Sequence, residues 1–228
     1  PWNRTSAMDL SAVPLPPGWS LSGLVLAAAL LAVALRRAPW DRFASSEITH
    51  VFYGGIFVMV VLWSLRATVG EGFAFHLLGV GAFTLLAGPT LALVGTAVAT
   101  AVTTAIGGGL WINSGLTFLT LGAGPVAVVW LTWRAAERLL PPNFFIYIFV
   151  TAFLGSALAL GAAGLAGSFV LVEAAGRDAA VVYGDYVPYV LYLAFGEGTL
   201  NGMIITLLVV YRPGWVTTFD DARYLVGR

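Results

Sequence analysis

The chain has 228 residues, of which 59% are hydrophobic and 10% are charged, whereas soluble domains are about 45–50% apolar and about 25% charged. With a mean hydropathy of +0.90, this composition predicts a polytopic membrane protein and excludes a soluble enzyme, a coiled coil and a disordered segment. Eleven basic residues, all of them arginine, balance eleven acidic residues, so no basic surface is available for nucleic acid. The absence of cysteine and lysine from the sequence excludes disulfides, thiolate metal sites and a P-loop.

Seven apolar stretches predict an all-α, polytopic membrane helix bundle of about seven transmembrane helices, in a single integral membrane domain over residues 1–228. In chain order they are Trp19–Leu35, Ile48–Leu65, Phe73–Ala87, Thr90–Ile106, Leu116–Trp133, Phe144–Val172 and Tyr186–Val210. Residues 1–18 are expected to be an extramembrane segment and residues 212–228 a cytoplasmic tail. The first stretch is expected to be a retained helix, because Arg36 and Arg37 follow it as a stop-transfer flank.

The third and fourth stretches form one uncharged run of 34 residues, from Phe73 to Ile106. A single helix of that length would measure about 51 Å, whereas the hydrocarbon core of a bilayer is about 30 Å thick. Gly88 and Pro89 lie near the middle of the run, and proline disfavours helix in the residue before it. The sequence therefore predicts a Gly-Pro break between spans three and four, with a re-entrant hairpin as the alternative.

The arginines test the number of spans, because cytoplasmic loops carry an excess of basic residues. With seven spans, three arginines fall on one side and eight on the other. The larger group comprises Arg36, Arg37, Arg42, Arg134, Arg138, Arg212, Arg223 and Arg228. This asymmetry predicts that the N-terminus lies outside and the C-terminus in the cytoplasm.

Two stripes of small residues recur at four-residue spacing and predict close helix contacts, since small side chains let backbones approach in a membrane. One begins at Gly88 and Ala92 in span four, and the other comprises Gly155, Ala159, Ala163 and Gly167 in span six. The preferred interpretation is packing within the chain. The alternative is a docking face for another subunit.

Glu197 is the one carboxylate predicted in the middle of a span, where charges are costly and are candidates for function. Asn201 lies four residues later, on the same face of the predicted helix. Glu197 is expected either to bind a cation or relay a proton, or to accept hydrogen bonds that lock two helices together. The sequence alone does not favour one of these roles over the other.

The two histidines are the only imidazoles in the chain, and with Glu197 they are candidate ligands for a divalent metal ion. For His76, the alternative is a packed, hydrogen-bonded side chain near the membrane interface. For His50, which follows Glu47 by three residues, the preferred interpretation is a surface contact.

The chain contains a run from His76-Leu-Leu-Gly through Leu85-Leu-Ala-Gly-Pro89, followed by Gly107-Gly-Gly-Leu and by Gly115-Leu-Thr-Phe-Leu-Thr-Leu-Gly122. These segments resemble the CbiM family, the substrate-specific membrane components of cobalt and nickel energy-coupling-factor transporters. The segments 142–149, 193–202 and 211–221 resemble a divergent proteobacterial branch labelled as energy-coupling-factor permeases, which implies a location in the bacterial inner membrane. The resemblance covers about Phe73 to Leu225 and implies a bundle of six to seven helices that docks on a coupling protein and two ATPases. The family's N-terminal metal-binding motif, Met-His-x-Pro-Asp-Gly, is not matched by Pro1-Trp2-Asn3-Arg4.

These observations favour a permease-like, substrate-binding component of an energy-coupling-factor ABC importer for a divalent metal ion. Its expected partners are membrane lipid, an ABC-type ATPase and a coupling membrane protein. The chain itself is expected to be no enzyme and to hold no cofactor other than a bound metal ion. The alternative is a non-transporting accessory or scaffold subunit of a larger membrane complex, and an intramembrane protease built on Ser156 is the least favoured interpretation.

Overall fold

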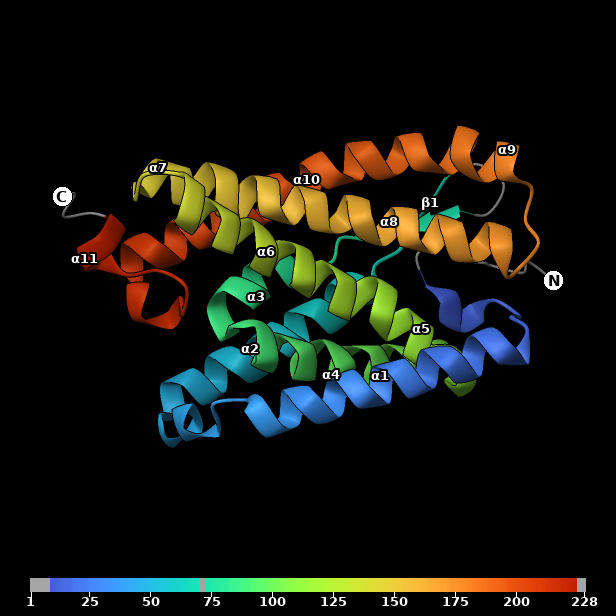
Figure 1. Ribbon diagram of the computed structural model, residues 1–228, viewed down its shortest axis with the longest axis horizontal. Helices are drawn as coiled ribbons and strands as arrows, with labels where there is room; N and C mark the ends of the chain where they lie inside the picture. The colour runs from blue at the N-terminus through green and yellow to red at the C-terminus, as the bar shows by residue number, and fades with distance from the viewer. Residues whose placement is uncertain (1–8, 70–72, 225–228) are drawn as a thin grey trace.

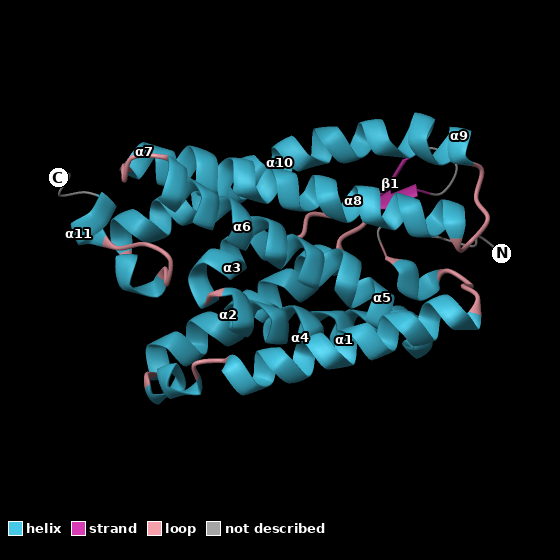
Figure 2. Cartoon of the chain, viewed as in Figure 1, coloured by secondary structure: helices cyan, strands magenta, loops and turns pink. Residues whose placement is uncertain are grey.

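A computed structural model describes residues 9–69 and 73–224 as a bundle of long helices (Figure 1). Figure 2 shows that nearly all of the described chain is helical, apart from one short antiparallel hairpin. The hairpin pairs β1 (Ala67–Val69) with β2 (Phe73–Phe75), with Thr68 opposite Ala74. The predicted all-α membrane bundle is therefore confirmed.

Six helical stretches of the described residues are long and apolar enough to cross a membrane. Three are single helices: α1 (Pro17–Arg37), α2 (Ser46–Ser64) and α4 (Pro89–Gly107). The other three are composite, because a π-helical segment joins two α-helices end to end. They comprise α5 (Ser114–Phe118) with α6 (Gly124–Leu139), α7 (Phe144–Ile146) with α8 (Gly155–Glu173), and α9 (Ala179–Val181) with α10 (Val187–Tyr211).

The predicted span three, Phe73–Ala87, is not among these six stretches, and it is only partly helical. It contains β2, an extended loop and α3 (Val80–Ala87), whose eight residues measure about 12 Å at 1.5 Å per residue. Gly79, at φ 67°, precedes α3 in a left-handed conformation that glycine adopts without strain. Pairing in the hairpin and this turn replace the helix expected over Phe73–Gly79, so the predicted count of about seven holds with one half-helix.

The predicted Gly-Pro break is confirmed. The half-helix α3 ends at Ala87, Gly88 adopts φ 82° and ψ 163°, and α4 begins at Pro89. Proline is favoured in the first turn of a helix, where its missing N–H would have no intrahelical partner. The chain therefore reverses between α3 and α4 without an additional loop.

The bundle has two distinct ends, which Figure 1 shows at right and left. The end that we call the N-terminal end carries a short 3-10 turn (Leu10–Ala12), the hairpin and the start of α9. The opposite, C-terminal end carries a turn at Trp40–Ala44, the start of α7, a turn at Pro213–Trp215 and α11 (Asp221–Tyr224). The larger predicted arginine group lies at this C-terminal end, as far as its residues are described.

At the N-terminal end, the segment from Asp9 to Val13 packs into the bundle. Leu10 and Val13 are buried, and Nη2 of Arg66 lies 2.5 Å from Oδ2 of Asp9. Asn113, also buried, donates from Nδ2 to the carbonyl of Val13 at 2.6 Å and accepts from Oγ of Ser20. These contacts join the N-terminal segment, α1, the end of α2 and the start of α5.

At the C-terminal end, the segment after α10 folds back over the bundle. Thr217 and Thr218 donate to the carbonyls of Leu86 and Leu85, the last turn of α3. The same segment is fixed by Trp215 Nε1, which donates to Glu47 at 2.7 Å, and by an ion pair between Arg223 and Glu137 at 2.7 Å. The predicted tail is thus a packed element that covers the end of α3.

The small-residue stripes lie inside the bundle. Gly155, Ala159, Ala163 and Gly167 are all buried on α8, which packs against α6 and α10. A Cβ built on Gly155 would lie 3.5 Å from Thr132 of α6. Gly88 is buried at the turn before α4, and Ala92 is buried on α4.

Candidate functional site

The candidate site forms where α10 meets the N-terminus of α3. Glu197 lies near the middle of α10 and is 1% exposed. Its Oε2 accepts a hydrogen bond from the backbone N–H of Leu78 at 2.8 Å, and its Oε1 accepts one from Gly79 at 2.7 Å. The carboxylate therefore binds two backbone groups of a segment more than a hundred residues away in sequence.

These contacts follow from the geometry of a half-helix. The first N–H groups of a helix have no intrahelical acceptor, and a negative group at a helix N-terminus is favoured by the helix dipole. The residue that precedes α3 is Gly79, which has no side chain to accept such a bond. Glu197, from another helix, accepts from the N–H of Gly79 itself and from that of Leu78, the residue before it.

Asn201 completes the same cap. Its Oδ1 accepts from the N–H of Ala82 at 2.7 Å, the third residue of α3. Its Nδ2 donates to Oε1 of Glu197 at 2.8 Å and to the carbonyl of Glu197 at 2.7 Å. The two side chains are therefore bound to each other as well as to α3, which is the arrangement that their four-residue spacing on one helix permits.

The loop between β2 and α3 is held from its other side by α2. Trp63 Nε1 donates to the carbonyl of Leu78 at 2.9 Å, so the residue whose N–H binds Glu197 also has its carbonyl bound. His76 lies in this loop, is 3% exposed, and packs its ring 6.0 Å from that of Trp63. Arg66, the cation paired with Asp9, donates to the carbonyl of Trp63.

The structure does not bring the three predicted metal ligands together. His50 is exposed near the start of α2, where its Nδ1 lies 2.6 Å from the carbonyl of Ser46. His76 packs against Trp63, thirteen residues further along α2, a separation of about 20 Å along a helix. Within residues 9–69 and 73–224, no group of three or more His, Cys, Asp or Glu side chains could hold a metal ion.

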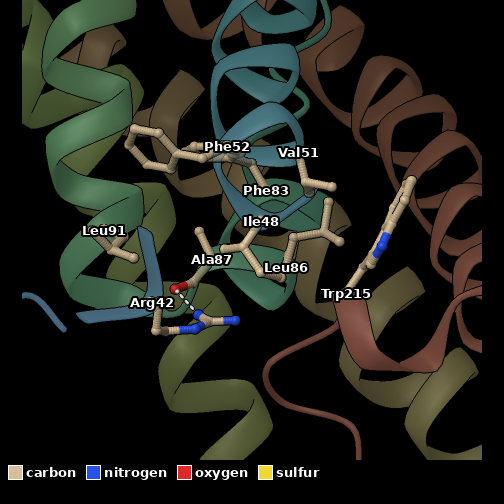
Figure 3. Close-up of a pocket in the computed structure, with 9 residues that line it drawn as sticks. All are labelled: Arg42, Ile48, Val51, Phe52, Phe83, Leu86, Ala87, Leu91 and Trp215. Atoms are coloured by element: carbon tan, nitrogen blue, oxygen red, sulfur yellow. Dashed lines mark hydrogen bonds between the residues drawn. The ribbon is translucent and has the colours of Figure 1, made fainter. Parts of the chain in front are cut away.

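A narrow crevice lies at the opposite end of α3, and Figure 3 shows the side chains that line it. Nη1 of Arg42 donates to the carbonyl of Ala87 at 3.1 Å, which satisfies one of the last carbonyls of α3. Trp215 borders the crevice from the C-terminal segment. The Arg42 bond goes to the backbone of α3, so this side of the crevice is part of the support of the half-helix.

Several residues of this region were not selected from the sequence. Trp63, Asp9 and Arg66 occur in segments that appear to be span ends or an extramembrane segment, where tryptophan and charges are ordinary. Thr217 and Thr218 belong to the predicted tail. The one sequence signal for them was the density of polar and aromatic residues after position 211.

Comparisons with known proteins add the family. The sequence profile of CbiM, described as the cobalt uptake substrate-specific transmembrane region, matches residues 10–215. No curated protein matches the chain. A crystal structure described as a truncated transition metal transporter superposes with a TM-score of 0.75 at 14% identity, covering 86% of this chain and 96% of the other.

A second crystal structure, described as a transition metal transporter, superposes with a TM-score of 0.69 at 14% identity and covers 85% of this chain and 89% of that chain. At this identity the two structures establish a shared fold. The profile match extends over most of the chain, from the buried N-terminal segment to the turn after α10. The chain therefore belongs to the CbiM family of cobalt uptake substrate-specific transmembrane regions.

Proposed function

We propose that this chain is the solute-capturing membrane component of an importer of the energy-coupling-factor type. The observation that carries the proposal is the family match over residues 10–215, which includes every element that builds the α3–α10 site. An ABC-type ATPase and a coupling membrane protein would supply the energy, and this chain would catalyse no reaction. The solute is a divalent transition-metal ion, for which Co²⁺ is the first candidate because of the family's description.

The α3–α10 region is the proposed place of solute capture. Discontinuous helices whose ends meet near the middle of a bundle are a recurring way to build a solute site in a membrane. Here His76 supplies an imidazole, a common ligand of transition metals, from the loop that Glu197 binds at Leu78. The buried ring of His76 has to become accessible for capture, so the N-terminal end of the bundle must open.

The orientation proposed with this function places the N-terminal end outside and the C-terminal end in the cytoplasm of a bacterial inner membrane. Among the described arginines, Arg66 and Arg177 lie toward the N-terminal end, and the positive-inside tendency places the larger group in the cytoplasm. Because the sequence has no cysteine, single cysteines at positions 177 and 220 provide the test. A membrane-impermeant maleimide should label intact cells at position 177 and not at position 220.

The proposed function is tested by purification in mild detergent and by uptake. Co-purification with an ABC-type ATPase and a coupling membrane protein, together with ATP-dependent ⁵⁷Co²⁺ uptake by vesicles that contain the complex, is the expected result. A His50→Gln variant is the matched control for His76→Gln, because His50 is exposed and distant from the site. Uptake that survives His76→Gln would refute the assigned place of capture.

A second candidate function is an accessory subunit that keeps the fold without transport. The absence of a three-ligand cluster from the described residues favours it. Recovery of an unrelated membrane complex at fixed stoichiometry, without an ATPase, would support this candidate and refute the importer.

A further inference from the structure

The contacts of Glu197 and Asn201 lead to an inference about how they act, and it rests on the function proposed above. We infer that these two residues are positioning residues, which act on the solute by holding α3 and the His76 loop rather than by contacting the solute. Both side chains are at most 1% exposed. Every hydrogen bond that the structure gives their side-chain atoms goes to α3, to its preceding loop, or to α10 itself.

Both oxygens of the Glu197 carboxylate already accept hydrogen bonds from the protein. Its two oxygens accept three N–H bonds, from Leu78, Gly79 and Asn201, at 2.7–2.8 Å. These lengths lie at the short end of the range for N–H···O hydrogen bonds. A cation that took Glu197 as a ligand would have to compete with three donors and would remove the cap of α3.

The side-chain amide of Asn201 is held in one orientation by its hydrogen bonds. Because its Nδ2 binds Glu197 twice, its Oδ1 is directed at Ala82, the third residue of α3. This is the bond that an asparagine makes when it caps its own helix, where it accepts from the second or third N–H. The same chemistry here connects two helices, so Asn201 fixes the position of α3 relative to α10.

The helix α10, which carries both side chains, is closely packed against a neighbouring segment. A Cβ built on Gly198 would lie 2.8 Å from the carbonyl oxygen of Phe153, and one on Gly202 would lie 3.3 Å from Phe153 Cβ. The helix that carries the cap is therefore packed closely against the preceding membrane segment. Glu197 and Asn201 project from a fixed helix toward a half-helix that begins at a left-handed glycine.

The hydrogen bond of Glu197 is linked to His76 through the loop that precedes α3. The peptide groups of Leu78 are held by Glu197 through the N–H and by Trp63 through the carbonyl. His76 precedes Leu78 by two residues and packs on the same Trp63 ring. Loss of the Glu197 bond would release one side of this loop, so the imidazole of His76 would move with the loop.

The test uses the two-histidine composition of the chain. In a His50→Gln background, ¹⁵N-histidine labelling leaves His76 as the single imidazole signal, and Co²⁺ is the probe. Glu197→Gln and Asn201→Ala are compared with Thr199→Val, a control on the same helix whose hydroxyl binds only the carbonyl of Phe195 among the described contacts. The measurements are the metal-free His76 signal, the Co²⁺ titration midpoint, and the visible spectrum at saturating Co²⁺.

Positioning predicts that both site variants shift the metal-free His76 signal and raise the Co²⁺ midpoint by about 10–100-fold, the usual effect of removing a group that orients a ligand. The spectrum at saturation stays that of the parent, since the ligands are the same, and Thr199→Val changes nothing. A changed saturated spectrum in Glu197→Gln would make Glu197 a ligand and overturn the inference. An unchanged His76 signal and midpoint in both variants would overturn it as well.

Failure of the proposed function gives a different result. If Co²⁺ does not alter the His76 signal while Glu197 and Asn201 are intact, the assigned capture site is refuted. The metal-free His76 signal then still decides whether the two residues position the loop. Asn201→Ala retains the carboxylate and is the milder change, so it provides the comparison if Glu197→Gln does not fold.

Discussion

Gly81 of α3 lies directly against Ser156 of α8, and its replacement by alanine tests how closely the half-helix packs into the bundle. A Cβ built on Gly81 would lie 2.6 Å from Ser156 Cβ and 3.2 Å from Ser156 Cα, and it would also contact the Ser156 hydroxyl. Ser156 Cα belongs to the backbone of α8, and Ser156 Cβ is attached directly to it. Rotation of the Ser156 side chain therefore cannot relieve the contact.

The size of the effect follows from two opposing contributions. Carbon atoms pack best at about 3.5–4.0 Å, so α3 and α8 would have to separate by about 1 Å. Excess volume in a packed core costs about 1–3 kcal/mol, and alanine in place of glycine in a helix recovers up to about 1 kcal/mol. Because the distance of 2.6 Å to Ser156 Cβ places the packing cost in the upper part of that range, we expect a net loss of about 1–2 kcal/mol, which lowers the unfolding midpoint of a chain of this length by about 2–8 °C.

The assay is thermal unfolding in one detergent, followed by size-exclusion chromatography. Ser156→Gly should restore the midpoint in the Gly81→Ala background, because it removes the opposing Cβ, whereas Ser156→Ala should restore it only in part. Gly161→Ala, where a Cβ would meet nothing within 4 Å, is the control. A Gly81→Ala protein with the midpoint of the parent, or no recovery with Ser156→Gly, would refute the packing of α3 on α8.

Three further predictions concern the ends of the bundle and are measured as unfolding midpoints in the same detergent. Gly88→Ala should lose about 1–3 kcal/mol, because φ 82° with ψ 163° is a conformation that essentially only glycine adopts; an unchanged midpoint would contradict that turn. Arg66→Gln should lose about 1–3 kcal/mol, because the buried Asp9 carboxylate loses this cation, and Asp9→Asn in the same protein should recover much of the loss if the pair is the cause. Thr218→Val keeps the shape but removes a hydroxyl that bonds the Leu85 carbonyl at 3.0 Å and the Tyr147 hydroxyl at 2.7 Å, so a loss of about 1–3 kcal/mol is expected, and an unchanged midpoint would contradict these two bonds.

The spans were predictable because the bilayer constrains sequence strongly. An apolar run of about 20 residues crosses as a helix, and six such stretches occur within residues 9–69 and 73–224. The break at Gly88 and Pro89 was also predictable, since local chemistry determines it. The extended part of span three was not, because apolarity alone does not distinguish a helix from a loop whose backbone is bound by neighbouring side chains.

The pairing of Glu197 with Asn201 was predictable from the sequence, but the helix end that the pair binds was not. A mid-span carboxylate with an asparagine four residues later is visible in the sequence, and the structure shows the hydrogen-bonded pair. The N–H groups that they bind lie at and just before the start of α3, more than a hundred residues earlier in the sequence. Only the tertiary fold reveals that Gly79 leaves α3 without a cap of its own, or that Trp63 holds the same loop.

The contacts of α3 explain why a broken segment can persist inside a membrane bundle. Backbone groups in hydrocarbon must be bonded within the protein, and an eight-residue helix leaves acceptors and donors unpaired at both ends. Glu197 and Asn201 bind N–H groups at and just before the start of α3, while Arg42, Thr217 and Thr218 bind its last carbonyls. Because α10 and the segment after it supply most of these groups, the C-terminal part of the chain stabilises both ends of the half-helix.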